Sequence, residues 1–184
     1  SMAVVVAVFM GGLALGSWAI GKYAVRSSNR VRLFGYMELA LGVSAILVYF
    51  GIRYLAPVIY SLPFNDIHSF SGIAIRITLS GLLLLLPTMI MGGTLPVLVR
   101  AVTEQKQKIM GNTSLLYSVN ALGAMFGAFV VGFFLIRYIG IFRSNLIAAA
   151  VEMLVGVVAL LISPGFKSSP DNVAEAETKP ELES

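Results

Sequence analysis

The sequence predicts an all-helical transmembrane bundle of about five spans, and three observations lead to this fold class. First, 58% of the 184 residues are hydrophobic and only 12% are charged, whereas soluble domains average about 45–50% apolar and about 25% charged residues. Second, the mean hydropathy is +0.89. Third, the apolar residues gather in separate stretches, each close to the ~20 residues that a helix needs to cross a bilayer.

The apolar stretches are separated by segments that carry charges, prolines or glycines. We expect the spans at about residues 3–25, 33–55, 73–99, 114–136 and 145–162. Together they form a transmembrane helical domain over residues 1–164. Residues 165–184 are rich in Ser, Pro, Glu and Lys. Because such a segment cannot bury a core, we expect a disordered acidic tail.

The longest connection is expected between the second and third spans, over residues 56–72. It mixes Pro57, Pro63, Asp66 and His68 with several aromatic residues. This composition suits the membrane–water interface and predicts an external segment, with a short amphipathic helix as one form that it could take.

The basic residues predict the orientation of the chain in the lipid bilayer. More of them flank the first and third loops and the end of the fifth span than flank the other connections, which makes the former side cytoplasmic. The N-terminus is then outside, the C-terminus is cytoplasmic, and the membrane is the cytoplasmic (inner) membrane. The cytoplasmic group comprises Lys22, Arg26, Arg30, Arg32, Arg100, Lys106, Lys108 and Lys167, and the opposite group Arg53, Arg76, Arg137 and Arg143.

Composition also argues against several classes of function. The chain has no cysteine and a single histidine, so we expect no disulfide, no metal site of Cys or His ligands, and no cofactor. The basic clusters lie at helix ends, where they match anionic lipid headgroups better than nucleic acid.

The run Pro87–Pro96 stands out because two prolines and the pair Gly92–Gly93 fall within one span. These residues are expected to break or kink the third helix. Broken membrane helices often form substrate or ion sites, since their ends expose backbone groups. A proline kink that serves only helix packing is the alternative, and the sequence leaves both open.

Two Gly-x-x-x-Gly patterns predict close helix packing. Gly12 and Gly16 form one, and Gly123 and Gly127 form the other. The spacing places two glycines on one face, where another helix backbone can approach. That helix belongs either to the same chain or to a partner chain, in a complex with other membrane subunits or in a homo-oligomer.

Three polar residues inside the spans are candidate binding residues. Glu38 lies near the start of the second span, where an ion pair with Arg30 or Arg32 is expected. Glu152 has no charged neighbour in its own span, so it is either protonated, hydrogen-bonded to another span, or in contact with a partner. Carboxylates within a membrane are costly and often functional. Asn120 is expected to join helices by hydrogen bonds.

Four stretches together resemble one family: Phe9-Met-Gly-Gly-Leu-Ala-Leu-Gly-Ser-Trp, Met37-Glu-Leu-Ala-Leu-Gly, the run Pro87–Pro96, and Leu116-Tyr-Ser-Val-Asn-Ala-Leu-Gly-Ala-Met-Phe-Gly-Ala. Their order and spacing are similar to the membrane domain of the membrane-bound spermidine-synthase-like proteins, also described as fused transporter/spermidine synthases. The resemblance covers about residues 6–161.

This resemblance implies a helical membrane domain that is followed, in the family, by a cytosolic aminopropyltransferase domain. That domain uses decarboxylated S-adenosylmethionine and a polyamine acceptor. Its glycine-rich nucleotide loop and catalytic aspartates have no counterpart in this sequence, so no catalytic residue is predicted. The leading hypothesis is a non-catalytic membrane module that acts as an anchor or partner-binding subunit. The alternative is a transporter-like protein for a polyamine or another organic cation, acting as an oligomer.

Overall fold

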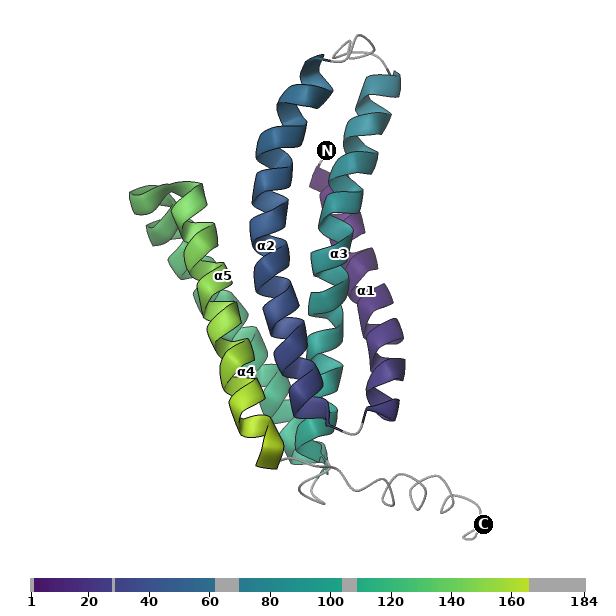
Figure 1. Ribbon diagram of the computed structural model, residues 1–184, viewed down its shortest axis with the longest axis vertical. Helices are drawn as coiled ribbons and strands as arrows, with labels where there is room; N and C mark the ends of the chain where they lie inside the picture. The colour runs from purple at the N-terminus through teal and green to yellow at the C-terminus, as the bar shows by residue number, and fades with distance from the viewer. Residues whose placement is uncertain (1, 28, 62–69, 104–108, 166–184) are drawn as a thin grey trace.

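The computed structural model describes the chain except for residues 1, 28, 62–69, 104–108 and 166–184 (Figure 1). Its elements are helical throughout the described ranges. They are α1 (Met2–Arg26), α2 (Arg30–Ser61), α3 (Phe70–Thr103), α4 (Ile109–Phe129), the π-helical segment η1 (Val130–Leu135), α5 (Ile136–Ile162) and the short 3-10 turn η2 (Ser163–Gly165).

Four helical stretches of the described chain are long and apolar enough to cross a membrane: Ala3–Ala24, Arg30–Tyr54, Ile77–Val102 and Ser114–Gly165. Helices satisfy their own backbone hydrogen bonds, which a hydrocarbon environment requires. The length and composition of these helices therefore indicate a helical membrane protein, in agreement with the fold class that the sequence predicts.

The fourth stretch differs from the others because it is 52 residues long. At about 1.5 Å per residue a straight helix of that length would extend about 78 Å. Gly140 interrupts it with φ 79° and ψ 167°, a conformation outside the helical region. Figure 1 shows the chain reversing direction in this region, so that α5 runs back toward the end from which α4 started.

Each helix packs mainly against one other helix. The most extensive contacts join α1 with α3 and α2 with α5, and α2 also packs against α3. The helix α4 makes few contacts with α3 and is exposed along most of its length. The small core of buried residues, Ala24, Met37 and Val97, joins α1, α2 and α3 near the short connection between α1 and α2. There the side-chain oxygen of Asn29 accepts a hydrogen bond from the backbone N–H of Arg32 at 3.0 Å and caps α2.

The structure corrects two expectations about the helices. The expected break at Pro87–Pro96 is not present, because α3 contains both prolines and remains a single helix. The second helix also extends beyond residue 55, through Pro57 to Ser61. What remains of the expected external segment lies largely at 62–69, and the expected tail lies, apart from Gly165, at 166–184; both ranges are outside the described residues.

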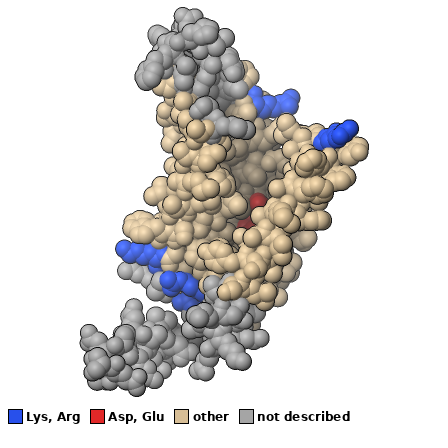
Figure 2. All heavy atoms as spheres, turned by 180° about the vertical axis from the view of Figure 1, so that it is seen from behind, with Lys and Arg blue, Asp and Glu red and all other residues tan. Residues whose placement is uncertain are grey.

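Charged residues are confined to particular parts of the surface. On the face in Figure 2, Lys and Arg side chains lie toward the two ends of the molecule, with a belt between them that shows no Lys or Arg. Such a belt is what a hydrocarbon layer would cover. The same face is hollowed between the α1/α3 side of the molecule and the α4–α5 hairpin, and acidic atoms are visible inside. We refer to this depression as the hollow.

Candidate functional site

The Gly-x-x-x-Gly pattern of α1 lies directly against α3. A β-carbon at Gly12 would collide with the side chain of Thr88, and one at Gly16 with the backbone carbonyl of Met89. Both glycines are buried. Since even one methyl group has no space at either position, the two helix backbones approach as closely as the pattern permits.

The glycine pair of α3 faces the same seam from the other side. A β-carbon at Gly92 would meet the backbone of Leu13, and one at Gly93 would meet the side chain of Ile20. Two motifs that the sequence presents as separate, one in α1 and one in α3, therefore form a single parallel helix–helix interface. Within the described part of the chain, Gly92 and Gly93 serve helix packing.

One proline of α3, Pro87, lies beside a polar residue. Proline cannot donate a backbone hydrogen bond. Next to Pro87, the hydroxyl of Thr88 contacts the carbonyl oxygens of Leu84 and Leu85, both at 2.9 Å. Thr88 is buried in the α1–α3 seam. The polar group at this proline is thus bonded within its own helix, as is common for Ser and Thr in membrane helices.

The second major seam joins α2 and α5, and hydrogen bonds define its two ends. The side-chain amide of Asn29 donates to the carbonyl of Ser163 at 2.8 Å. At the other end, the amide of Asn145 donates to the carbonyl of Ala45 at 3.0 Å. Going from the first hydrogen bond to the second, residue numbers rise in α2 and fall in α5. The two helices are therefore antiparallel.

Small residues bring the α2 and α5 backbones together between these hydrogen bonds. A β-carbon at Gly35 would lie 3.0 Å from the carbonyl oxygen of Gly156, and one at Gly42 would lie 3.0 Å from that of Ala149. Both contacts agree with the register between α2 and α5 that the hydrogen bonds of Asn29 and Asn145 define. This register places position 38 of α2 level with position 152 of α5.

Glu38 and Glu152 are therefore opposite one another in the middle of the seam. The two carboxyl groups are near enough to act on each other electrostatically. Glu38 is only 9% exposed and Glu152 is partly buried. The two are also the only acidic residues in the described ranges, so the acidic atoms inside the hollow in Figure 2 belong to this pair.

The expected ion pair of Glu38 was wrong. Within the described residues, no hydrogen bond or ion pair joins either glutamate to another side chain. The Nε of Arg30 donates to the Ala24 carbonyl at 3.0 Å, and Arg32 donates to the Tyr36 hydroxyl at 3.2 Å. The first turn of α2 directs these guanidinium groups to partners closer to the helix end, and Glu38 faces α5.

No protein-family model, curated protein or solved structure matches the chain. Among the described residues, no group of three or more His, Cys, Asp or Glu side chains is placed to hold a metal ion.

The second Gly-x-x-x-Gly pattern has a different environment from the first. Within the described chain, nothing lies within 4 Å of a β-carbon built at Gly123 or Gly127. Asn120 is exposed on the same helix, and no hydrogen bond links its side chain to a described residue. The structure thus brings Gly12 and Gly16 into an intramolecular seam and leaves the α4 residues without a neighbour.

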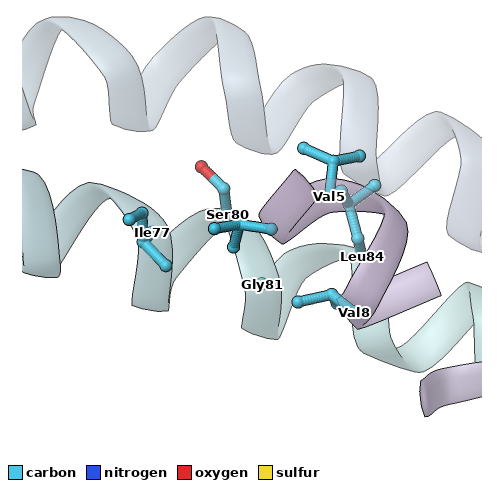
Figure 3. A pocket seen from close by; sticks show the side chains of 7 residues that line it. Val5, Val8, Ile77, Ser80, Gly81 and Leu84 are labelled. Carbon is cyan, nitrogen blue, oxygen red and sulfur yellow. The ribbon is translucent and has the colours of Figure 1, made fainter. Parts of the chain in front are cut away.

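A cavity of about 200 Å³ lies between the first half of α1 and α3 (Figure 3). Its lining comprises Val4, Val5, Val8, Ile77, Ser80, Gly81 and Leu84. Apart from the Ser80 hydroxyl, these side chains offer only apolar contacts. The cavity contains none of the residues that the sequence singles out, and it has no charged group with which to select a ligand.

Sequence reasoning missed the residues that set the α2–α5 register: Asn29, Gly35, Gly42, Asn145 and Gly156. A signal for them was present. Gly35 and Gly42 flank Glu38 at helical spacing, as Ala149 and Gly156 flank Glu152. A carboxylate between two small residues on one helix face marks a closely packed seam, and the two matching patterns predict which helices meet there.

Proposed function

We propose that this chain is a non-catalytic membrane module that binds a partner or anchors it, related to the membrane domain of the spermidine-synthase-like proteins. The observation that carries the proposal is the face of α4 formed by Asn120, Gly123 and Gly127, which has no described neighbour. At 100° per residue, these positions lie on one side of the helix.

This face, which we call the α4 face, has two properties of a helix-packing surface. Its glycines allow a second backbone to approach, and its asparagine supplies a hydrogen-bond donor and acceptor. An amide that faces lipid has no hydrogen-bond partner, which costs free energy. Packing against another membrane helix removes that cost, so we assign the α4 face to a partner subunit or a second copy of the chain.

The proposal includes a topology of five crossings. The turn at Gly140 divides Ser114–Gly165 into two antiparallel helices, each long enough to cross. With the basic residues of the α1–α2 end on the cytoplasmic side, the C-terminus also lies in the cytoplasm of a cell whose inner membrane holds the protein. A soluble partner domain, as in the resembling family, would then reach the chain at this side.

The test is association in a gentle detergent, measured by native mass spectrometry of the protein purified from its membrane. We expect a species larger than the 19.7 kDa chain, either a complex with another protein or a homo-oligomer. Substitution Gly127→Ile should remove most of this species, because its side chain fills the space that a second backbone would occupy.

Gly11→Ile is the matched control, since nothing lies within 4 Å of a β-carbon at Gly11 on α1 either. It should leave the larger species intact. A chain that is monomeric before any substitution, or equal loss in both variants, would contradict the proposal.

A second candidate function is favoured by the glutamate pair. Two facing carboxylates at the bottom of a hollow can attract a cation, which supports a transporter-like protein for a polyamine or another organic cation, acting as an oligomer. Uptake of labelled spermidine into proteoliposomes is the measurement. Uptake that depends on the protein and is unaffected by Glu38→Gln and Glu152→Gln would remove the pair from such a mechanism.

A further inference from the structure

The glutamate pair is the strongest unexplained feature of the molecule. Glu38 is more than nine-tenths buried, and no described residue bonds to its carboxylate. Buried polar groups normally have a partner, and the cost of leaving a carboxylate without one is larger in a low-dielectric environment. Glu152 does not supply that partner, because no hydrogen bond joins the two carboxyl groups.

The pair is held in position by rigid contacts on both sides. Toward one end, the backbones of Gly35 and Gly156 almost touch, and toward the other those of Gly42 and Ala149 do. The hydrogen bond from Asn145 to Ala45 opposes sliding of the helices past one another. The backbone positions 38 and 152 cannot separate without breaking these contacts, so the protein keeps the two residues level with one another.

The hollow exposes part of the glutamate pair outside the seam. In Figure 2 acidic atoms can be seen between the α1/α3 side and the α4–α5 hairpin. The surrounding surface of the hollow is uncharged. A ligand that reaches the pair must therefore combine a positive group with a body that tolerates apolar surroundings.

The donor set decides which kind of cation fits best. Calcium takes six to eight oxygen ligands and magnesium takes six. The site offers two glutamates, and no third metal-ligating side chain joins them among the described residues. Backbone carbonyls of α2 and α5 are engaged in their own helices. An alkylammonium carries up to three N–H donors, and these match the four oxygens of two carboxylates.

We propose that Glu38 and Glu152 form a binding site for a small organic ammonium ion, whose N–H groups donate to both carboxylates while its alkyl part lies in the hollow. The inference deepens the second candidate function and rests on the same two carboxylates. It requires neither translocation nor a partner at the α4 face.

The experiment is equilibrium binding to the full chain in nanodiscs of phosphatidylcholine, a lipid without net charge. The probe is n-butylammonium chloride, titrated by calorimetry at constant ionic strength. We expect saturable binding. Tetramethylammonium has the same charge and no N–H donor, so it should bind at least about tenfold more weakly, as expected for the loss of charge-assisted hydrogen bonds.

Variants identify the site. Glu38→Gln and Glu152→Gln should each weaken butylammonium binding at least about tenfold, since each removes one partner of a desolvated charge pair. Glu104→Gln is the matched control because it removes a glutamate that lies outside the described residues, and it should bind as the parent chain does. Should either Gln variant fail to fold, Glu38→Asp and Glu152→Asp keep the charge with a shorter side chain, and each should still weaken binding.

The outcomes separate this inference from the proposals above. Absence of saturable binding, equal binding of both ammonium ions, or binding that none of the pair's variants changes would overturn the site. Binding without uptake in proteoliposomes would keep the site and remove transport. A monomeric chain that binds butylammonium would keep the site and remove the partner-binding proposal.

Discussion

Glycines of this chain differ in what surrounds them, although they are equivalent in the sequence. Gly16 is buried against the backbone of α3, whereas nothing lies within 4 Å of a β-carbon at Gly21 on the same helix. Gly16 is therefore needed for close helix packing, whereas Gly21 is not.

Gly16→Ala should lower the free energy of unfolding by roughly 1–3 kcal/mol, the usual cost of inserting a methyl group into a closely packed interface. The measurement is unfolding by SDS in mixed micelles. Gly21→Ala is the control and should leave stability unchanged or slightly raised, because alanine favours the helix. If both variants lose the same stability, the close approach of α1 and α3 is not what stabilises the protein.

The pairing of Glu38 with Glu152 illustrates what single residues in the sequence do not reveal. Each carboxylate was recognisable as unusual because charged residues are rare within membrane helices. Their proximity depends on the register between α2 and α5, which are far apart in the chain. The ion pair that seemed natural for Glu38 relied on neighbours in sequence, whereas the helix turns its side chain toward a distant element.

At the scale of elements, length and composition predicted the helices well and their packing poorly. Apolar stretches mark spans because a bilayer requires about 20 such residues. In a soluble helix, the apolar face also indicates the packed side. Lipid and protein interior are both apolar, so this signal is lost, and small residues remain as the guide. They correctly mark α1 and α3 as packing helices, but do not say that each packs against the other.

The prolines of α3 show a related limit. Two prolines and two glycines in ten residues predicted a break or a kink, and the structure excludes the break because the helix is continuous. Glycine there provides close approach to α1, and neighbouring hydroxyl groups and helices can satisfy the carbonyls that proline leaves free. The composition that marks a broken helix is thus also the composition of a closely packed one.

The reversal between α4 and α5 depends on Gly140, whose φ of 79° and ψ of 167° lie in a region that only glycine occupies readily. We expect Gly140→Ala to destabilise the protein by roughly 1–3 kcal/mol through backbone strain. Thermal unfolding in detergent is the measurement. Gly132→Ala makes a suitable comparison, since a β-carbon there also meets nothing within 4 Å and its φ is not positive. Equal melting temperatures for the two variants would contradict a strained turn at Gly140.

At the scale of the whole molecule, the order of crossings can be tested because the chain contains no cysteine. Four single-cysteine variants each place one thiol near a helix end: after α1, at the end of α2, near the turn between α4 and α5, and after α5. They are Ser27→Cys, Ser61→Cys, Tyr138→Cys and Gly165→Cys. With five crossings, a membrane-impermeant maleimide should label Ser61→Cys and Tyr138→Cys from one side and Ser27→Cys and Gly165→Cys from the other.

Tyr138 is the decisive position, as it is 74% exposed and close to the turn. If residues 114–165 crossed only once, a thiol at position 138 would lie in the hydrocarbon and would not react from either side. The control is labelling in permeabilised membranes, where the reagent reaches both sides. With five crossings, all four thiols should react there.

The α2–α5 seam also has a consequence for how the protein is made. During synthesis α1, α2 and α3 enter the membrane before α5 exists, and the surface of α2 that carries Glu38 is then uncovered. The chain must pass through a stage in which this carboxylate faces lipid, water or the insertion machinery. Only when α5 turns back at Gly140 does this surface of α2 acquire its neighbour. Completion of α5 is therefore the step at which Glu38 acquires its surroundings in the α2–α5 seam.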